Sequence, residues 1–213
     1  MIRSDLYAER SEGVLQDGLE AAETSLWIVN PTRDDITQLV SLFRESQPPS
    51  PPSTVRLFAE REPLRRLADD FLLAGVAAEL ADDGTLELRT LEATSRQSLL
   101  LTENSVVSLV ECEDSVAGLT TTRDRFVRAA YEEYTTRWKD AERFSLRTPP
   151  LSEIRTTLEA ALGPEVLEDF DRALETLEAE RDHTDGMLDE VTITLLVAAN
   201  NGELLYDISR WGE

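Results

Sequence analysis

Residues 189–213 read DEVTITLLVAANNGELLYDISRWGE, two amphipathic segments on either side of an Asn-Asn-Gly turn. The first segment carries apolar residues at helical spacing, at Leu188, Val191, Leu195 and Ala198, and the second carries them at Leu204, Ile208 and Trp211. Because Asn and Gly tolerate positive φ, the first helix is expected to end at 200–202. Two short helices joined by a tight turn that contains glycine predict the first half of a helix-turn-helix.

The second half of that motif is not visible in the sequence. A helix-turn-helix that reads DNA needs a further helix in the major groove, so we expect 187–213 to hold the first helices, with the recognition helix absent from this chain. Arg210 is the only basic residue between 187 and 213 and is the candidate DNA phosphate contact, with an intrahelical pair to Asp207 as the alternative. We therefore expect residues 1–213 to bind promoter DNA weakly, and affinity to return in a chain extended past Glu213.

Charge dominates the composition. The 213 residues include 43 acidic and 21 basic side chains, for a net charge of -22, and Lys139 is the only lysine. Abundant arginine, almost no lysine and acids in every segment indicate a halophilic, haloarchaeal protein. At molar salt the Debye length is only about 3 Å. The acidic composition therefore indicates adaptation to a salty solvent rather than the type of binding partner. It does not exclude a nucleic-acid partner.

The sequence favours a cytoplasmic protein. No apolar run approaches the roughly 20 residues of a membrane span, and the N-terminus lacks the apolar core of a signal peptide. Cys112 is the only cysteine, so an intramolecular disulfide is excluded. Because acidic neighbours raise a thiol pKa, Cys112 is interpreted as a small filler rather than a nucleophile.

Residues 1–145 predict an α/β domain. Strand patterns at 25–30, 54–59 and 85–91 alternate with helical patterns at 11–23, 32–43 and 63–82. A meander of strands follows at 97–102, 106–111 and 115–121, and a long helix at 124–144 closes the domain. This order predicts a mixed sheet, with parallel strands first and an antiparallel meander later.

The C-terminal third predicts helices alone. Pro149 and Pro150 break the preceding helix, and apolar stripes then indicate helices at 151–162 and 164–177, in a helical linker or dimerisation region at 146–186. The stripes consist of Leu151, Ile154, Leu158, Leu162, Leu167, Phe170, Leu174 and Leu177. We expect a homodimer with these helices in or next to its interface. Packing of the stripes on the chain's own α/β domain is the alternative.

Candidate ligand-binding residues follow the first two predicted parallel strands. They are Asn30, Thr32, Arg33, Glu60 and Arg61. Ligands of open α/β sheets bind at the carboxyl ends of the strands, so these are candidate effector-binding residues. The alternative is that they cap helices or carry surface charge. His183, the only histidine, lies in a polar loop, and we expect no metal, no cofactor and no catalytic residues.

Several strings resemble a known family, the haloarchaeal TbsP-type transcriptional regulators. They are FSLRTPPLS at 144–152, GPEV at 163–166, DF at 169–170, LDEVTI at 188–193, LLVAA at 195–199, LLYDIS at 204–209 and WGE at 211–213. The resemblance implies an N-terminal sensor or dimerisation domain and a winged helix-turn-helix that binds promoter DNA. It also implies an α/β domain similar to the phospholipase-D-like domain of sugar-sensing archaeal regulators, used without catalysis.

What the resemblance implies about function is control of transcription, with sugar or central carbon metabolism genes as the expected targets. An interaction or ligand-sensing module that does not bind DNA is the alternative. A phosphodiesterase is disfavoured, because that chemistry needs a nucleophilic histidine near a lysine, and this chain has only His183 and Lys139 in different regions.

Overall fold

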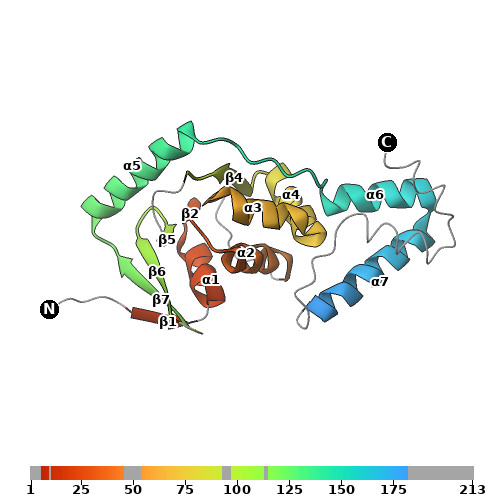
Figure 1. The fold of residues 1–213 in the computed structure, drawn as a ribbon, viewed down its shortest axis with the longest axis horizontal. Coiled ribbons are helices and arrows are strands. Elements are labelled where there is room, and N and C mark those ends of the chain that lie inside the picture. Colours follow the sequence, from red (N-terminus) through yellow and green to blue (C-terminus); the bar gives the residue numbers. More distant parts are fainter. Residues whose placement is uncertain (1–5, 10, 46–53, 93–96, 113–114, 182–213) are drawn as a thin grey trace. The chain divides into compact units, whose positions relative to one another are not determined.

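The computed structural model describes residues 6–9, 11–45, 54–92, 97–112 and 115–181 (Figure 1). These form two compact units, the first made of Met1–Leu67 with Leu80–Arg147 and the second of Ala68–Glu79 with Thr148–Glu213. No helix in the described part of the chain is long and apolar enough to cross a membrane.

The first unit is a seven-stranded sheet flanked by helices. The strands are β1 (Leu6–Glu9), β2 (Ser25–Val29), β3 (Thr54–Ala59), β4 (Leu86–Thr90), β5 (Ser98–Leu101), β6 (Val106–Cys112) and β7 (Ser115–Thr121), in the order β1-β7-β6-β5-β2-β3-β4. β2, β3 and β4 are parallel, and all other pairings are antiparallel. The predicted mixed sheet is confirmed, while β1, which pairs with β7, was not expected.

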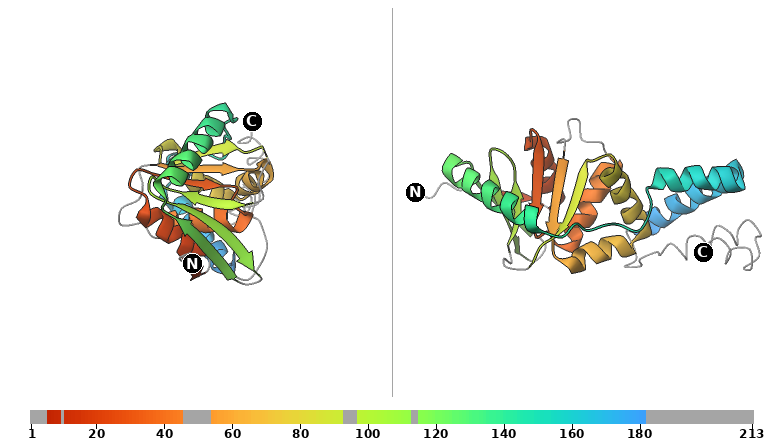
Figure 2. Two further views of the ribbon diagram at one scale, coloured as in Figure 1. Left: turned by 90° about the vertical axis from the view of Figure 1, so that its left-hand side faces the viewer. Right: turned by 90° about the horizontal axis from the view of Figure 1, so that it is seen from above.

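Helices cover both faces of this sheet. They are α1 (Ser11–Ala21), α2 (Arg33–Glu45), α3 (Arg61–Asp69) and α5 (Asp124–Asp140). All five residues of β2 are buried, which is typical of a strand covered on both sides. α1 lies against one face, because a Cβ on its Gly18 would come within 3.2 Å of Leu100 and 3.6 Å of Leu26. α5 crosses the other face, which Figures 1 and 2 show.

Aromatic rings fix α5 on its face of the sheet. Trp138 of α5 meets Trp27 of β2 edge to face, with ring centroids 5.3 Å apart, and meets Phe58 of β3 at 5.4 Å. Tyr131 approaches Trp27 in the same way at 5.7 Å. Such pairs contribute about 0.5–1.5 kcal/mol each beyond their buried area. The position of the C-terminal end of α5 is therefore set by rings on the two central parallel strands.

Two predicted helices end earlier than their apolar patterns indicate. The helix predicted at 63–82 is divided into α3 and α4 (Phe71–Asp82) at Asp70, whose carboxylate accepts a hydrogen bond from the Leu73 N–H at 3.1 Å and starts a new helix. The helix predicted to reach 144 ends at Asp140. Residues 142–144 instead pair with β4, where the Thr90 N–H donates to the Glu142 carbonyl at 2.9 Å. The Arg89 guanidinium holds the helix end by donating to the carbonyl oxygens of Trp138 and Ala141.

The second unit joins α4 to α6 (Leu151–Leu162) and α7 (Pro164–Arg181). Leu151 packs directly on Gly75 of α4, and Phe170 of α7 meets Phe71 of α4 edge to face at 6.4 Å. Leu151, Phe170 and Leu174 are buried, so part of each apolar stripe packs within the chain itself, on a helix from the stretch predicted as the α/β domain. The alternative predicted packing on the α/β domain, whereas these three residues belong to the same unit as α4; dimerisation through the stripes stays a prediction.

Candidate functional site

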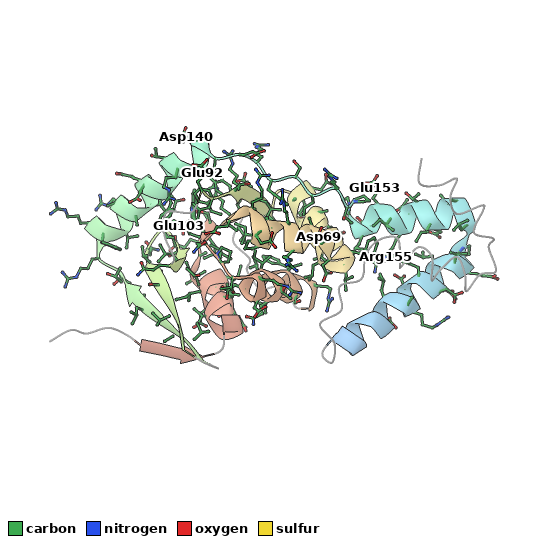
Figure 3. All side chains as sticks on the ribbon, in the orientation of Figure 1. Asp69, Glu92, Glu103, Asp140, Glu153 and Arg155 are labelled. Carbon is green, nitrogen blue, oxygen red and sulfur yellow. The ribbon has the colours of Figure 1, made fainter. Side chains whose placement is uncertain are left out.

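A cavity of about 560 Å³ opens in the first unit, where β3, β4 and α5 all end. Its lining residues are Phe58, Arg61, Thr90, Leu91, Glu92, Arg137, Asp140, Ala141 and Glu142. In Figure 3, the labelled side chains of Glu92 and Asp140 lie near the C-terminal end of α5. The cavity therefore occupies the carboxyl edge of the parallel strands, where ligands of open α/β sheets bind.

Backbone hydrogen bonds build the walls of this cavity. The Leu91 N–H donates to the Ala59 carbonyl at 2.6 Å and extends the pairing of β4 with β3 beyond their last residues. The Thr90 N–H donates a hydrogen bond to the Glu142 carbonyl, and this bond holds the segment after α5 against the same edge. Phe58 and Leu91 are buried and form an apolar floor. The Thr90 hydroxyl is buried and has no hydrogen-bond partner among the described residues, so a bound polar group can satisfy it.

Charges of both signs surround the apolar floor. Arg61 forms an ion pair with Glu142 at 2.5 Å, and both side chains are largely exposed. The guanidinium of Arg137 lies over the rings of Tyr134 and Phe58, 5.4 and 6.0 Å from their centroids. Glu92 and Asp140 add negative charge, and the C-terminal end of α5 adds the negative end of its helix dipole. This lining suits a small polar ligand that both donates and accepts hydrogen bonds.

The five predicted effector residues lie in different surroundings. Arg61 lines the cavity, and Asn30, Thr32, Arg33 and Glu60 do not. Asn30 adopts a positive φ of 50° at the end of β2, where its N–H donates to the Phe58 carbonyl at 2.7 Å. Thr32 caps α2, because its hydroxyl accepts from the Asp35 N–H at 3.2 Å while the Asp35 carboxylate accepts from the Thr32 N–H at 2.9 Å. Effector binding by any of the five stays a prediction.

Several lining residues were not predicted from the sequence. Thr90, Leu91 and Glu92 stand at and just after the end of β4, so the rule that selected Glu60 and Arg61 would have found them once β4 was assigned as the third parallel strand. No such pattern in the neighbouring sequence marks Arg137 and Asp140 as residues of a ligand site. They reach the cavity because Trp138, which lies between them, packs on Trp27 and Phe58.

Comparison with known families assigns both parts of the chain. Residues 3–149 match the N-terminal domain of TbsP-like transcriptional regulators, and residues 150–213 match the C-terminal helix-turn-helix domain of the same regulators. The chain belongs to the TbsP-like transcriptional regulators. The resemblance noted in the sequence is confirmed, and α6 and α7 lie within the stretch assigned to the helix-turn-helix domain of the TbsP-like family.

Solved structures resemble the TbsP-like chain at low identity. TrmBL2, described as an archaeal chromatin protein with a novel mode of DNA binding, superposes with a TM-score of 0.44 at 18% identity, over 65% of this chain and 53% of its own. Nuc, a phospholipase D family member from Salmonella typhimurium, and NucT from Helicobacter pylori each give a TM-score of 0.42 at 12% identity, over 67% of this chain and 99% of theirs. The chain thus matches about half the length of TrmBL2. No curated protein matches it.

A second polar cluster in the TbsP-like α/β unit surrounds Glu103, in the turn between β5 and β6. Its carboxylate accepts hydrogen bonds from the Thr24 hydroxyl and from the Ser25 N–H at 2.8 Å. The Ser25 hydroxyl is in turn 3.0 Å from the Tyr131 hydroxyl of α5. Burial alone would raise the pKa of Glu103, but the hydrogen bonds from Thr24, Ser25 and the backbone outweigh it and lower the pKa. This cluster ties the turn to the amino end of β2.

The remaining predicted residues of the TbsP-like chain lie elsewhere. Arg210, His183 and the helices predicted within 187–213 are outside the described residues. Within 6–9, 11–45, 54–92, 97–112 and 115–181, no group of three or more His, Cys, Asp and Glu side chains is placed to hold a metal ion. Lys139 is exposed on the last turn of α5.

Proposed function

We propose that this TbsP-like protein is a cytoplasmic, homodimeric regulator of a salt-loving archaeon, whose helix-turn-helix domain binds promoter DNA and whose α/β unit binds a small-molecule effector. The observation that supports this most directly is the cavity at the carboxyl edge of β3 and β4, in a chain whose other family domain is a helix-turn-helix. Sugar or central carbon metabolism genes are the proposed targets. No catalytic step is part of the proposal.

The proposed DNA contact lies toward the C-terminal end of the chain. In the described part of the helix-turn-helix domain, Arg155 is paired with Asp171 at 2.8 Å and Arg172 with Asp169 at 2.5 Å. Cations already paired with carboxylates contribute less to phosphate binding, which supplies much of the affinity for DNA. We therefore assign the phosphate contacts to residues after 181, with Arg210 as the candidate among them.

The proposed effector site is supported by the chemistry of its lining. The unpartnered Thr90 hydroxyl and the Glu92 carboxylate offer hydrogen-bonding groups, and Phe58 and Leu91 offer an apolar floor. Binding sites for small molecules combine an apolar surface with a few such polar groups. A ligand that bridges β4 and the end of α5 adds to the hydrogen bonds that Arg89 of β4 already donates to the carbonyls of Trp138 and Ala141. Through these contacts, effector binding would stabilise this edge of the α/β unit.

The test measures promoter occupancy in the host. Chromatin immunoprecipitation of the tagged protein, as its own gene encodes it, is expected to enrich promoters, and to do so to a different extent when the carbon source changes. Thr90→Val removes the unpartnered hydroxyl at nearly constant volume, and Thr136→Val is its matched control on the exposed side of α5. We expect Thr90→Val to keep the promoters and lose the response to carbon source, and Thr136→Val to keep both.

Two outcomes overturn different parts of this proposal. Absence of promoter enrichment refutes DNA regulation and favours the second candidate, an interaction or ligand-sensing module that does not bind DNA. A carbon-source response that survives both Thr90→Val and Glu92→Gln refutes the effector cavity alone.

A further inference from the structure

Large apolar side chains are exposed at three places in the described part of the chain, on three elements that follow one another in the sequence. Val110 of β6 is 46% exposed, Leu119 of β7 is 40% exposed and Phe126 of α5 is 55% exposed. β6 and β7 are adjacent strands, and α5 begins after a two-residue connection from β7. Exposed apolar residues scattered singly need no explanation, but a cluster of them marks an interaction surface.

The strand register puts Val110 and Leu119 on the face of the sheet that α5 crosses. Val106 pairs with Leu101, which pairs with Trp27, and these three residues belong to the core beneath α5. Val110 lies four residues after Val106 and therefore points to the same face. Leu119 does so as well, because it pairs with Ser108. α5 covers Val106, which is 5% exposed, while Val110 and Leu119 on the same face stay exposed.

The adjacent surface of α5 carries a charge pattern that complements itself. Arg125, Ala129 and Glu132 follow one another at i, i+4 and i+7, so they share one side of the helix, and all three are exposed. If a second α5 packs antiparallel on this side, Arg125 of each copy faces Glu132 of the other. Ala129 lies between them and permits close approach of the two helices. A surface that matches itself in this way fits an interface with two-fold symmetry.

We propose that Val110, Leu119 and Phe126, with Arg125, Ala129 and Glu132 of α5, dock a second copy of the chain across a two-fold axis. Ala129 and the two Arg125–Glu132 pairs lie beside the two-fold axis, and the apolar side chains of Val110, Leu119 and Phe126 pack next to them. The choice of a second copy also rests on the proposed function, since helix-turn-helix regulators bind paired half-sites as dimers. This location differs from the helices 151–181, where Leu151, Phe170 and Leu174 are already buried within the chain.

Sedimentation equilibrium of the full chain in molar KCl, without DNA, tests this interface. We expect a dimer, and we expect Phe126→Asp and Leu119→Asp each to weaken dimerisation about tenfold or more, because each variant buries an unpaired charge among apolar side chains of the interface. Gln16→Asp adds the same charge to an exposed position on α1, which lies against the opposite face of the sheet, and is expected to leave the dissociation constant unchanged. Thermal melts followed by circular dichroism verify that each variant is folded.

A charge exchange tests the two-fold geometry itself. Arg125→Glu or Glu132→Arg places like charges opposite each other, and we expect each to weaken the dimer, while the double variant restores it. Molar KCl leaves mainly the charges in direct contact interacting, so distant charges do not obscure the result. Failure of the double variant to restore the dimer refutes the proposed pairing.

Two further outcomes overturn the proposal. One is a monomeric wild-type chain. The other is a dimer that resists both Phe126→Asp and Leu119→Asp but dissociates on Leu158→Asp in α6. Because no DNA is present, these outcomes are distinct from a failure of promoter binding.

Discussion

Replacing Gly75 with alanine is expected to destabilise the second unit by about 1–2 kcal/mol. A Cβ at this position of α4 would lie 2.7 Å from Cγ and 2.8 Å from Cδ2 of Leu151, well inside the roughly 3.5–4.0 Å at which carbon atoms attract. Leu151 is 4% exposed, so other atoms enclose its side chain. Glycine to alanine in a helix ordinarily stabilises by about 0.5–1 kcal/mol, but overpacking a core costs about 1–3 kcal/mol, and here overpacking should prevail.

Urea unfolding at constant KCl, followed by circular dichroism, measures the effect, with Leu151→Ala as the partner variant. Leu151→Ala alone should cost about 2–5 kcal/mol. In the double variant the alanine at 75 occupies part of the vacated space. We therefore expect the double variant to be more stable than the sum of the single changes predicts, by about 0.5–3 kcal/mol. Additive effects, or a Gly75→Ala variant as stable as the wild type, would refute the packing of α6 on α4.

Three other outcomes are expected. The melting temperature should rise with KCl, because salt screens repulsion among 43 acidic side chains that only 21 basic ones balance. Glu103→Gln should lower the free energy of unfolding at neutral pH by about 1–2 kcal/mol. Because folding lowers the pKa of Glu103 from its ordinary value of 4.5, the extra stability of the wild type is fully present above pH 4.5. This extra stability is lost as the pH falls through the lowered pKa of the folded state. Trp138→Ala should cost about 3–5 kcal/mol and change the near-ultraviolet circular dichroism, since Trp138 contacts Trp27 and Phe58.

Each of these outcomes has a contradicting result. A melting temperature independent of KCl would contradict adaptation to brine. Glu159→Gln, at an exposed position of α6, serves as the control for Glu103→Gln, and equal losses in the two variants would remove any special role for the Glu103 cluster. Unchanged near-ultraviolet signals after Trp138→Ala would contradict the packing of its ring on Trp27.

Local patterns predicted the parts of the fold that local chemistry determines. The apolar run at 25–29 predicted β2, and Thr32 followed by acids predicted the start of α2. The division at Asp70 was missed because the apolar spacing runs on through 64–80, and a capping aspartate is indistinguishable in sequence from one on a helix surface. The end of α5 was missed because Arg89, from a strand far away in sequence, holds its last carbonyls.

The sequence predicted the location of the candidate site better than it predicted which residues line it. Sequence order placed it at the carboxyl ends of the parallel strands, and the cavity lies there and includes Arg61. Arg137 and Asp140 could not be predicted, because they reach the cavity through ring contacts between α5 and two distant strands. The cluster at Val110, Leu119 and Phe126 depends on strand register and on where α5 crosses the sheet, neither of which apolar periodicity reveals.

The second unit is assembled from two pieces of chain, and this affects both its synthesis and its isolation. A ribosome finishes α4, whose residues Phe71–Ala78 are all buried in the folded protein, long before it adds Leu151. The nascent chain therefore carries an apolar helix without part of its packing partner until Leu151 and Phe170 have been added. For the same reason, a recombinant fragment that starts at residue 150 lacks the helix on which Leu151 and Phe170 pack. Such a fragment is expected to aggregate unless residues 68–79 are supplied with it.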